Sequence, residues 1–190
     1  MADTDNPLKF DSQAAFAQWL AAHHGDADGV FLLHAKKGKG ATTVTYDEAL
    51  EVALCFGWID GMRKSAGEQF FMQRWTPRRA RSIWSKVNRD KALRYIEEGR
   101  MQPAGLAEIE RARKDGRWDA AYDSVSKSQV PPDLQAAFDA RPGAQAFFAT
   151  VSSQNRYAVL FRIQTAKKPE TRARRIAQFA DMLARGETLY

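Results

Sequence analysis

The chain has 190 residues, enough for one large hydrophobic core or for two smaller ones. It is 44% hydrophobic and contains 11 Phe, 5 Trp and 5 Tyr, a composition that excludes a disordered protein. The single cysteine, Cys55, excludes an internal disulfide framework, and no apolar run reaches the roughly 18 residues of a membrane span. Because no secretory signal pattern is present either, we expect a soluble cytoplasmic protein without membrane insertion.

The net charge of +6 is unevenly distributed along the chain. Residues 62–94 contain 10 Lys/Arg against 2 Asp/Glu, and residues 162–185 contain 7 against 2. These segments carry net charges of +8 and +5, so the rest of the chain carries −7. Two basic segments on an otherwise acidic chain predict one positive face if the fold brings them together, whereas two separate solvated faces are the ordinary alternative.

The first predicted elements are a helix and a buried strand. Asp11 or Ser12 can cap a helix that carries Phe16 and Trp19 on one face and ends near the polar segment HHGDADG. The run VFLLHAK, residues 30–36, is typical of a short buried strand that ends at a turn rich in Gly and Lys.

A capping box marks the next helix. Thr45 and Glu48 have the spacing in which each side chain bonds the other residue's backbone N–H, and Gly57 lies where the helix would end. Two strands, over about 58–64 and 69–75, are then predicted to form a hairpin.

Proline and capping residues predict three shorter helical segments after the hairpin. Pro77 is expected at the first position of a short helical turn, because proline fits the start of a helix. Asn88 is expected to cap a second helix with Leu93 and Ile96 facing inward, and Pro103 to begin a third with Leu106 and Ile109 buried.

The remaining sequence predicts a linker and a helical C-terminal portion. The linker, residues 124–131, is nearly free of apolar residues and precedes a segment in which every element is helical. The predicted helices cover residues 132–140, 143–150, 152–166 and 169–185. We therefore predict an α+β protein: residues 1–123 form a small antiparallel sheet packed with helices, and residues 132–190 form an all-helical portion.

The histidines do not indicate a metal site. His23 and His24 are adjacent at a helix end and point in different directions, and no acidic residue has a ligand spacing to them or to His34. We expect neither a metal nor a cofactor.

Asp60 is the one candidate catalytic residue. It lies between Trp58 and Met62 on a predicted strand, and a buried carboxylate must pair with a cation or take up a proton. A structural pair with a neighbouring arginine is the interpretation we favour, and the alternative is an acid or base in a small enzyme. The possible partners are Arg63, Arg74, Arg78, Arg79 and Arg81.

Residues 74–91 combine aromatic and basic residues. Trp75 and Trp84 are interleaved with seven Lys/Arg, a pattern that would suit stacking on the bases of a nucleic acid if the tryptophans were exposed. Core tryptophans are the favoured interpretation, so nucleic-acid binding is expected to be weak and non-specific.

The segment AKKPETRARRI, residues 166–176, places cations at a predicted helix start. The macrodipole disfavours cations there, and Arg172 falls on the apolar side of the helical wheel. Arg172 must therefore reach an internal carboxylate, backbone carbonyls or a bound anion. We favour the internal partner, and keep Lys167, Lys168, Arg172 and Arg175 as candidate anion ligands.

Four motifs together resemble a known family. YDEALEVALCFGWIDG, TPRRARSIWSKVNRDKA, GRMQPAGLAEIERARKDGRWDAAYD and AKKPETRARRI, in this order, are similar to the bacterial YdeI/OmpD-associated family, the bacteriocin-protection proteins. The resemblance extends from about residue 8 to 186. It implies a soluble α+β protein with a family-defining helical C-terminal portion, a link to stress or peptide-toxin resistance and to an outer-membrane porin, and no established enzymatic activity.

We therefore expect a cytoplasmic stress-protection protein, without enzymatic activity, that binds an anionic small molecule or an acidic protein surface. The oligomeric state is left open. The candidate ligand-binding residues are Lys167, Lys168, Arg172, Arg175, Arg78, Arg79, Trp58 and Asp60.

Overall fold

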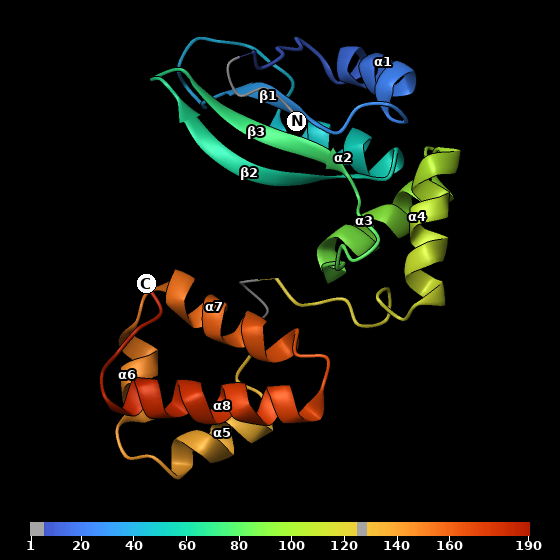
Figure 1. Ribbon diagram of the computed structural model, residues 1–190. Coiled ribbons are helices and arrows are strands. Elements are labelled where there is room, and N and C mark those ends of the chain that lie inside the picture. The colour runs from blue at the N-terminus through green and yellow to red at the C-terminus, as the bar shows by residue number, and fades with distance from the viewer. Residues whose placement is uncertain (1–5, 125–128) are drawn as a thin grey trace. The chain divides into compact units, whose positions relative to one another are not determined.

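The structure is a computed structural model that describes residues 6–124 and 129–190. The chain divides into two compact units (Figure 1). Unit 1 comprises the chain up to Trp84 together with Asn88–Ala121, and unit 2 comprises Ser85–Val87 together with Tyr122–Tyr190. Four residues of the predicted linker, 125–128, lie outside the described residues.

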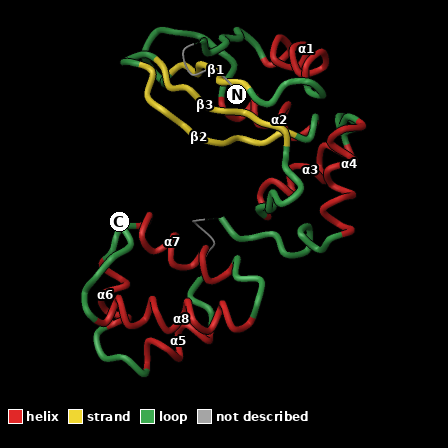
Figure 2. Tube along the Cα trace, in the orientation of Figure 1, coloured by secondary structure: helices red, strands yellow, loops and turns green. Residues whose placement is uncertain are grey.

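Unit 1 contains a three-stranded antiparallel sheet (Figure 2). The strands are β1 (Val30–Ala35), β2 (Trp58–Ala66) and β3 (Phe70–Pro77), in the spatial order β1-β3-β2. β2 and β3 form the predicted hairpin, with Trp58 opposite Pro77 and Ala66 opposite Phe70. The small antiparallel sheet predicted from the sequence is therefore confirmed.

Two helices pack on the face of the sheet that carries Trp75. In α1 (Gln13–His23) the side chain of the N-cap Ser12 accepts a hydrogen bond from the Ala15 N–H. In α2 (Tyr46–Cys55) both hydrogen bonds of the predicted capping box are present. Phe16 of α1 and Tyr46 of α2 contact the Trp75 ring at centroid distances of 6.1 and 5.7 Å, so both helices cover the same face.

Two further helices follow the sheet, α3 (Lys86–Glu97) and α4 (Pro103–Lys114). The main chain of α4 lies against the end of α2 at Gly105. A methyl group added at this glycine would lie 2.2 Å from the Cys55 carbonyl oxygen, so only glycine fits. That carbonyl also accepts a hydrogen bond of 3.0 Å from the Gln102 N–H.

Three details predicted for this region are wrong. Pro77 ends β3 instead of beginning a helix, because the strand continues for as long as β2 lies beside it. α3 begins at Lys86, two residues before the expected cap Asn88. Leu93 and Leu106 are 38% and 43% exposed, whereas Ile109 is buried as predicted. The buried stripe of the two helices consists of Ala92, Tyr95, Ile109 and Ala112.

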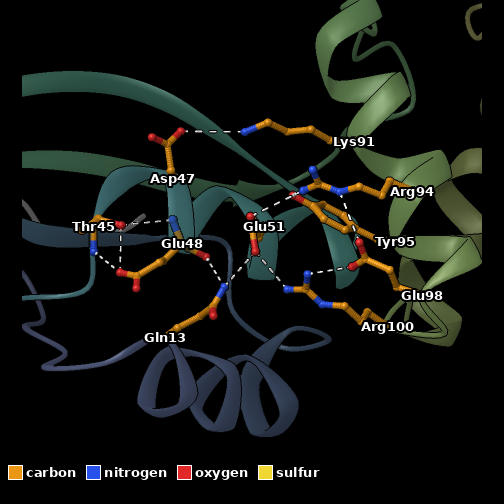
Figure 3. A network of polar contacts seen from close by, with 10 residues as sticks. All are labelled: Gln13, Thr45, Asp47, Glu48, Glu51, Lys91, Arg94, Tyr95, Glu98 and Arg100. Carbon is orange, nitrogen blue, oxygen red and sulfur yellow. Dashed lines mark hydrogen bonds and ion pairs between the residues drawn. The ribbon is translucent and has the colours of Figure 1, made fainter.

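Glu51 links three elements of unit 1 (Figure 3). Its Oε2 accepts hydrogen bonds from Gln13 Nε2 at 3.2 Å and from Arg100 Nη2 at 3.0 Å, and its Oε1 lies 3.7 Å from Arg94 Nη2. Burial alone would raise the pKa of Glu51, but the hydrogen bonds from Arg100 and Gln13 outweigh it and lower the pKa. The ionised carboxylate thus joins α1, α2 and α3.

Unit 2 has its own core and is formed by helices (Figure 2). They are α5 (Pro132–Asp139), α6 (Ala144–Thr150), α7 (Ser153–Gln164) and α8 (Pro169–Ala184). Ser85 forms a parallel bridge with Tyr122 at the start of this unit, where Lys86 N–H donates to the Tyr122 carbonyl at 2.8 Å. The α+β class with a helical C-terminal portion is confirmed.

A membrane-crossing helix would have to be long and apolar, and none of the helices in the described part of the chain meets both conditions.

Candidate functional site

Arg172, at the start of α8, has an internal carboxylate partner. Its Nε donates to Asp133 Oδ2 at 2.6 Å and its Nη2 to Oδ1 at 2.8 Å, and its Nη1 donates to the Ile163 carbonyl at 3.1 Å. The hydrogen bonds from Arg172 lower the pKa of Asp133. Arg172 therefore joins α8 to α5 and α7, as favoured from the sequence.

The other cations of this helix start differ in their contacts. Arg175 donates to the Arg162 carbonyl, so it too bonds unit 2 itself. Lys167 and Lys168 are exposed, and neither side chain has a hydrogen-bond or ion-pair partner among residues 6–124 and 129–190. Two of the four predicted ligands thus hold the fold together, and the two lysines remain free for an anion.

Trp58 and Asp60 take structural positions in unit 1. Trp58 is 1% exposed, and its Nε1 donates to the His24 carbonyl at 3.2 Å. Asp60 is half-buried and accepts a hydrogen bond of 3.1 Å from the Tyr46 hydroxyl. The expected pair with an arginine is absent from the described residues, because Tyr46 at the start of α2 reaches this carboxylate instead.

Trp75 and Trp84 belong to the core of unit 1, at 0% and 1% exposure, and cannot stack on bases. Trp75 Nε1 donates to His34 Nε2 at 3.4 Å, and His34 Nδ1 contacts the Val44 carbonyl at 2.8 Å. These partners define a neutral imidazole with its proton on Nδ1. Burial lowers the pKa of His34, in agreement with that state.

The side chains of β3 that point away from the core line a pocket. Alternation along β3 places Arg74 and Thr76 on one face, opposite to Gln73 and Trp75, and Arg78 and Arg79 follow directly after the strand. The pocket encloses about 340 Å³ and lies within unit 1. We call it the arginine pocket, and its lining residues are Asp28, Arg74, Thr76, Pro77, Arg78 and Arg79.

The three arginines of this pocket have different environments. Arg78 is 5% exposed, lies 3.6 Å from the centre of the Trp84 ring and donates to the Ile83 carbonyl at 3.3 Å. The guanidinium groups of Arg74 and Arg79 have no hydrogen-bond or ion-pair partner within the described part of the chain. The Nε atom of Arg74 is also buried, which makes this missing partner costly.

The arginine pocket brings together two predicted ligands, Arg78 and Arg79, and adds Arg74, Thr76 and Asp28. From the sequence, Arg74 was considered as a partner of Asp60 and as one of the seven cations of residues 74–91. Its place in the pocket was missed because the strand was predicted to end at residue 75, whereas β3 continues to Pro77 and so brings Arg74 and Thr76 to the same face. Asp60 and Trp58 do not line this pocket, and Lys167, Lys168, Arg172 and Arg175 belong to unit 2.

Two family models match the chain. Residues 8–108 match the model described as Domain of unknown function (DUF8412), and residues 127–186 match the model described as Bacteriocin-protection, YdeI or OmpD-Associated. No curated protein and no solved structure gives a significant match. The second model confirms the resemblance to the YdeI/OmpD-associated family over residues 127–186, where the motif AKKPETRARRI lies, whereas the other three motifs lie outside this match. The first model covers more than half of the chain, so the chain belongs to the DUF8412 family and carries a YdeI/OmpD-associated domain in its C-terminal part.

Proposed function

We propose that this chain is a bacteriocin-protection-type protein that acts by binding an anionic ligand in the arginine pocket, without being an enzyme itself. The proposed role in protection rests on the family match of residues 127–186. The proposed binding rests on the geometry of unit 1.

The observation that supports binding is the state of Arg74. A guanidinium has five N–H donors in a fixed planar arrangement that matches the oxygens of a carboxylate or phosphate. Arg74 uses none of them within the described residues, although its Nε is buried. An anion in the pocket would supply the missing acceptors, and Arg79 and the Thr76 hydroxyl line the same space.

The charges around the pocket support an anion over a cation. Three arginines face a single carboxylate, Asp28, which gives the lining a net charge of +2. Most of the contacts of Arg78 are internal, so Arg74 and Arg79 are the residues from which we expect direct contact with the ligand.

Phosphate-dependent stability tests this proposal. The five tryptophans, Trp19, Trp58, Trp75, Trp84 and Trp118, all belong to unit 1, so tryptophan fluorescence follows the unfolding of the unit that holds the pocket. We expect about 50 mM phosphate, compared with chloride at equal ionic strength, to raise the melting temperature of the wild type by mass action.

Two matched variants separate binding from screening. Arg74→Gln should abolish the phosphate response, whereas Arg81→Gln, which removes the same charge from an exposed residue outside the pocket lining, should retain it. Equal responses in the two variants would show that phosphate acts only through the general charge of the segment.

The cytoplasm is the compartment in which we propose that this binding takes place. The single cysteine, Cys55, is a free and buried thiol, which fits a reducing environment. Fractionation of cells that express the chain tests this part of the proposal, and recovery outside the cytoplasmic fraction would contradict it.

A further inference from the structure

A carboxylate lies among the arginines of the arginine pocket. Asp28 is exposed and lines the pocket, yet the described residues contain no hydrogen-bond or ion-pair partner for its side chain. It is also more than 4.0 Å from the nitrogens of Arg74 and Arg79, since no ion pair joins them. The pocket therefore presents separate positive and negative groups to the same space.

The backbone holds Asp28 at this position. Gly29, the next residue, has a φ of +143°, and a methyl group added there would lie 2.8 Å from Thr76 Cγ2 and 2.8 Å from the Trp75 carbonyl oxygen. The loop thus lies directly on β3 at a point where only glycine fits. Asp28 is placed by this close approach of two backbones, because its own side chain makes no fixing contact.

A simple anion does not suit this arrangement fully. It would satisfy Arg74 and Arg79, but it would also lie near the Asp28 carboxylate, and like charges in one site disfavour each other. A ligand that also carries a cation would pair with Asp28 and turn this repulsion into attraction.

We propose that the arginine pocket binds a small zwitterion, a molecule with an oxyanion and a primary ammonium group. This inference rests on the proposed anion-binding function and specifies its ligand. The oxyanion contacts the guanidinium groups of Arg74 and Arg79 and the hydroxyl of Thr76, and the ammonium donates to the carboxylate of Asp28. A volume of about 340 Å³ suits a small molecule and not a folded partner.

Calorimetry with two phosphate monoesters tests the inference on the full chain. Ethyl phosphate and O-phosphoethanolamine have the same skeleton, but only the second carries an ammonium group. At neutral pH the first has the larger negative charge, so a pocket that recognises negative charge alone binds ethyl phosphate more tightly. We expect the opposite order in the wild type, with O-phosphoethanolamine bound about tenfold more tightly.

Asp28→Asn should reverse this order. The variant loses the acceptor for the ammonium and the repulsion of the phosphate, so O-phosphoethanolamine should bind about tenfold more weakly and ethyl phosphate more tightly than to the wild type. Asp26→Asn is the matched control, because it removes a carboxylate from the same loop outside the pocket lining and should preserve the wild-type order. β-Alanine, titrated in the same way, shows whether a carboxylate replaces the phosphate.

The outcomes separate this inference from the function on which it rests. The inference that the ligand is a zwitterion is wrong if ethyl phosphate binds the wild type as tightly as O-phosphoethanolamine. It is also wrong if Asp28→Asn leaves the order of the two affinities unchanged. Anion binding then stands as long as Arg74→Gln abolishes the binding of ethyl phosphate. If neither phosphate ester binds the wild type, both the anion site and its zwitterionic ligand are refuted.

Discussion

Replacement of Arg172 by methionine is expected to destabilise unit 2. The substitution keeps most of the apolar side chain and removes two hydrogen bonds to Asp133 and one to the Ile163 carbonyl. Hydrogen bonds to charged groups contribute about 1.5–3 kcal/mol when they are well shielded. Here the Arg172 and Asp133 side chains are 31% and 46% exposed, so the pair lies between a surface pair of about 0–1 kcal/mol and a buried pair whose disruption costs about 3–5 kcal/mol.

The helix macrodipole reduces the stability that is lost in Arg172→Met. Arg172 lies in the first turn or so of α8, and removing a cation from there is favourable by about 0.3–1 kcal/mol. We therefore expect Arg172→Met to lower the free energy of unfolding by about 1–2 kcal/mol, which for a unit of this size corresponds to a fall in melting temperature on the order of 5–15 °C.

The assay must report on unit 2 and not on unit 1. Amide hydrogen exchange in α5 and α8 does so, while tryptophan fluorescence should stay unchanged because all five tryptophans lie in unit 1. Arg174→Met is the matched control, since Arg174 is exposed on the same helix and has no partner in the described part of the chain. A double-mutant cycle that combines Arg172→Met with Asp133→Asn should give a coupling energy of about 1 kcal/mol between the two side chains.

Two results would refute the internal role of Arg172. One is a variant with the same exchange protection in α5 and α8 as the wild type. The other is a phosphate-induced stabilisation of unit 2 that occurs in the wild type and vanishes in Arg172→Met, because this would make the start of α8 an anion site.

Four further predictions concern unit 1 and the chain as a whole. Leu54→Ala should cost about 2–5 kcal/mol in a denaturant titration because Leu54 is 1% exposed, whereas Leu106→Ala, at a position 43% exposed, should change stability by no more than about 0.5 kcal/mol. Gly105→Ala should cost about 1–3 kcal/mol in the same titration, although alanine favours helices, since its methyl group would strike the backbone of Cys55; a stability equal to the wild type would contradict this contact. Burial lowers the pKa of His34, so as the pH falls the unfolded chain takes up a proton before the folded chain does. The free energy of unfolding of unit 1 should therefore decrease as the pH drops below about 6.5. His34→Gln should make this decrease smaller when stability is measured across the same pH range. DNA binding, measured by fluorescence anisotropy, should weaken linearly in log affinity with log salt and be equal for two unrelated sequences, and sequence-selective binding at physiological salt would show that an interface has been missed.

Several helix starts could be predicted because their signals are local, although those expected at Pro77 and Asn88 were wrong. Ser12, Thr45, Pro103 and Pro169 act through bonds to residues three or four positions away, or through a fixed backbone angle, and each is found where the sequence placed it. Leu93 and Leu106 were assigned to the wrong face because the buried stripe of a helix depends on what packs against it. That partner comes from another part of the chain.

The candidate site was predictable only in part for the same reason. The cluster of arginines at 78 and 79 stands out in the sequence, whereas the position of Asp28 depends on a contact between a loop and a strand more than 40 residues apart. Tyr46 as the partner of Asp60 depends likewise on the packing of α2 against β2. Charge identified a basic segment, but which of its members lack internal partners is a property of the folded chain.

Unit 2 includes a short piece of chain from far upstream, Ser85–Val87. Besides the backbone bond to Tyr122, Lys86 forms an ion pair of 2.8 Å with Asp123. A gene segment that encodes only residues 122–190 would therefore leave these partners behind. A single crossover at residue 122 therefore transfers the C-terminal domain without these contacts, whereas a crossover before residue 85 keeps them but also transfers Asn88–Ala121, which belong to unit 1. No single crossover separates the two units cleanly, so exchange of the C-terminal domain alone is expected to weaken the bonds around Tyr122 and Asp123.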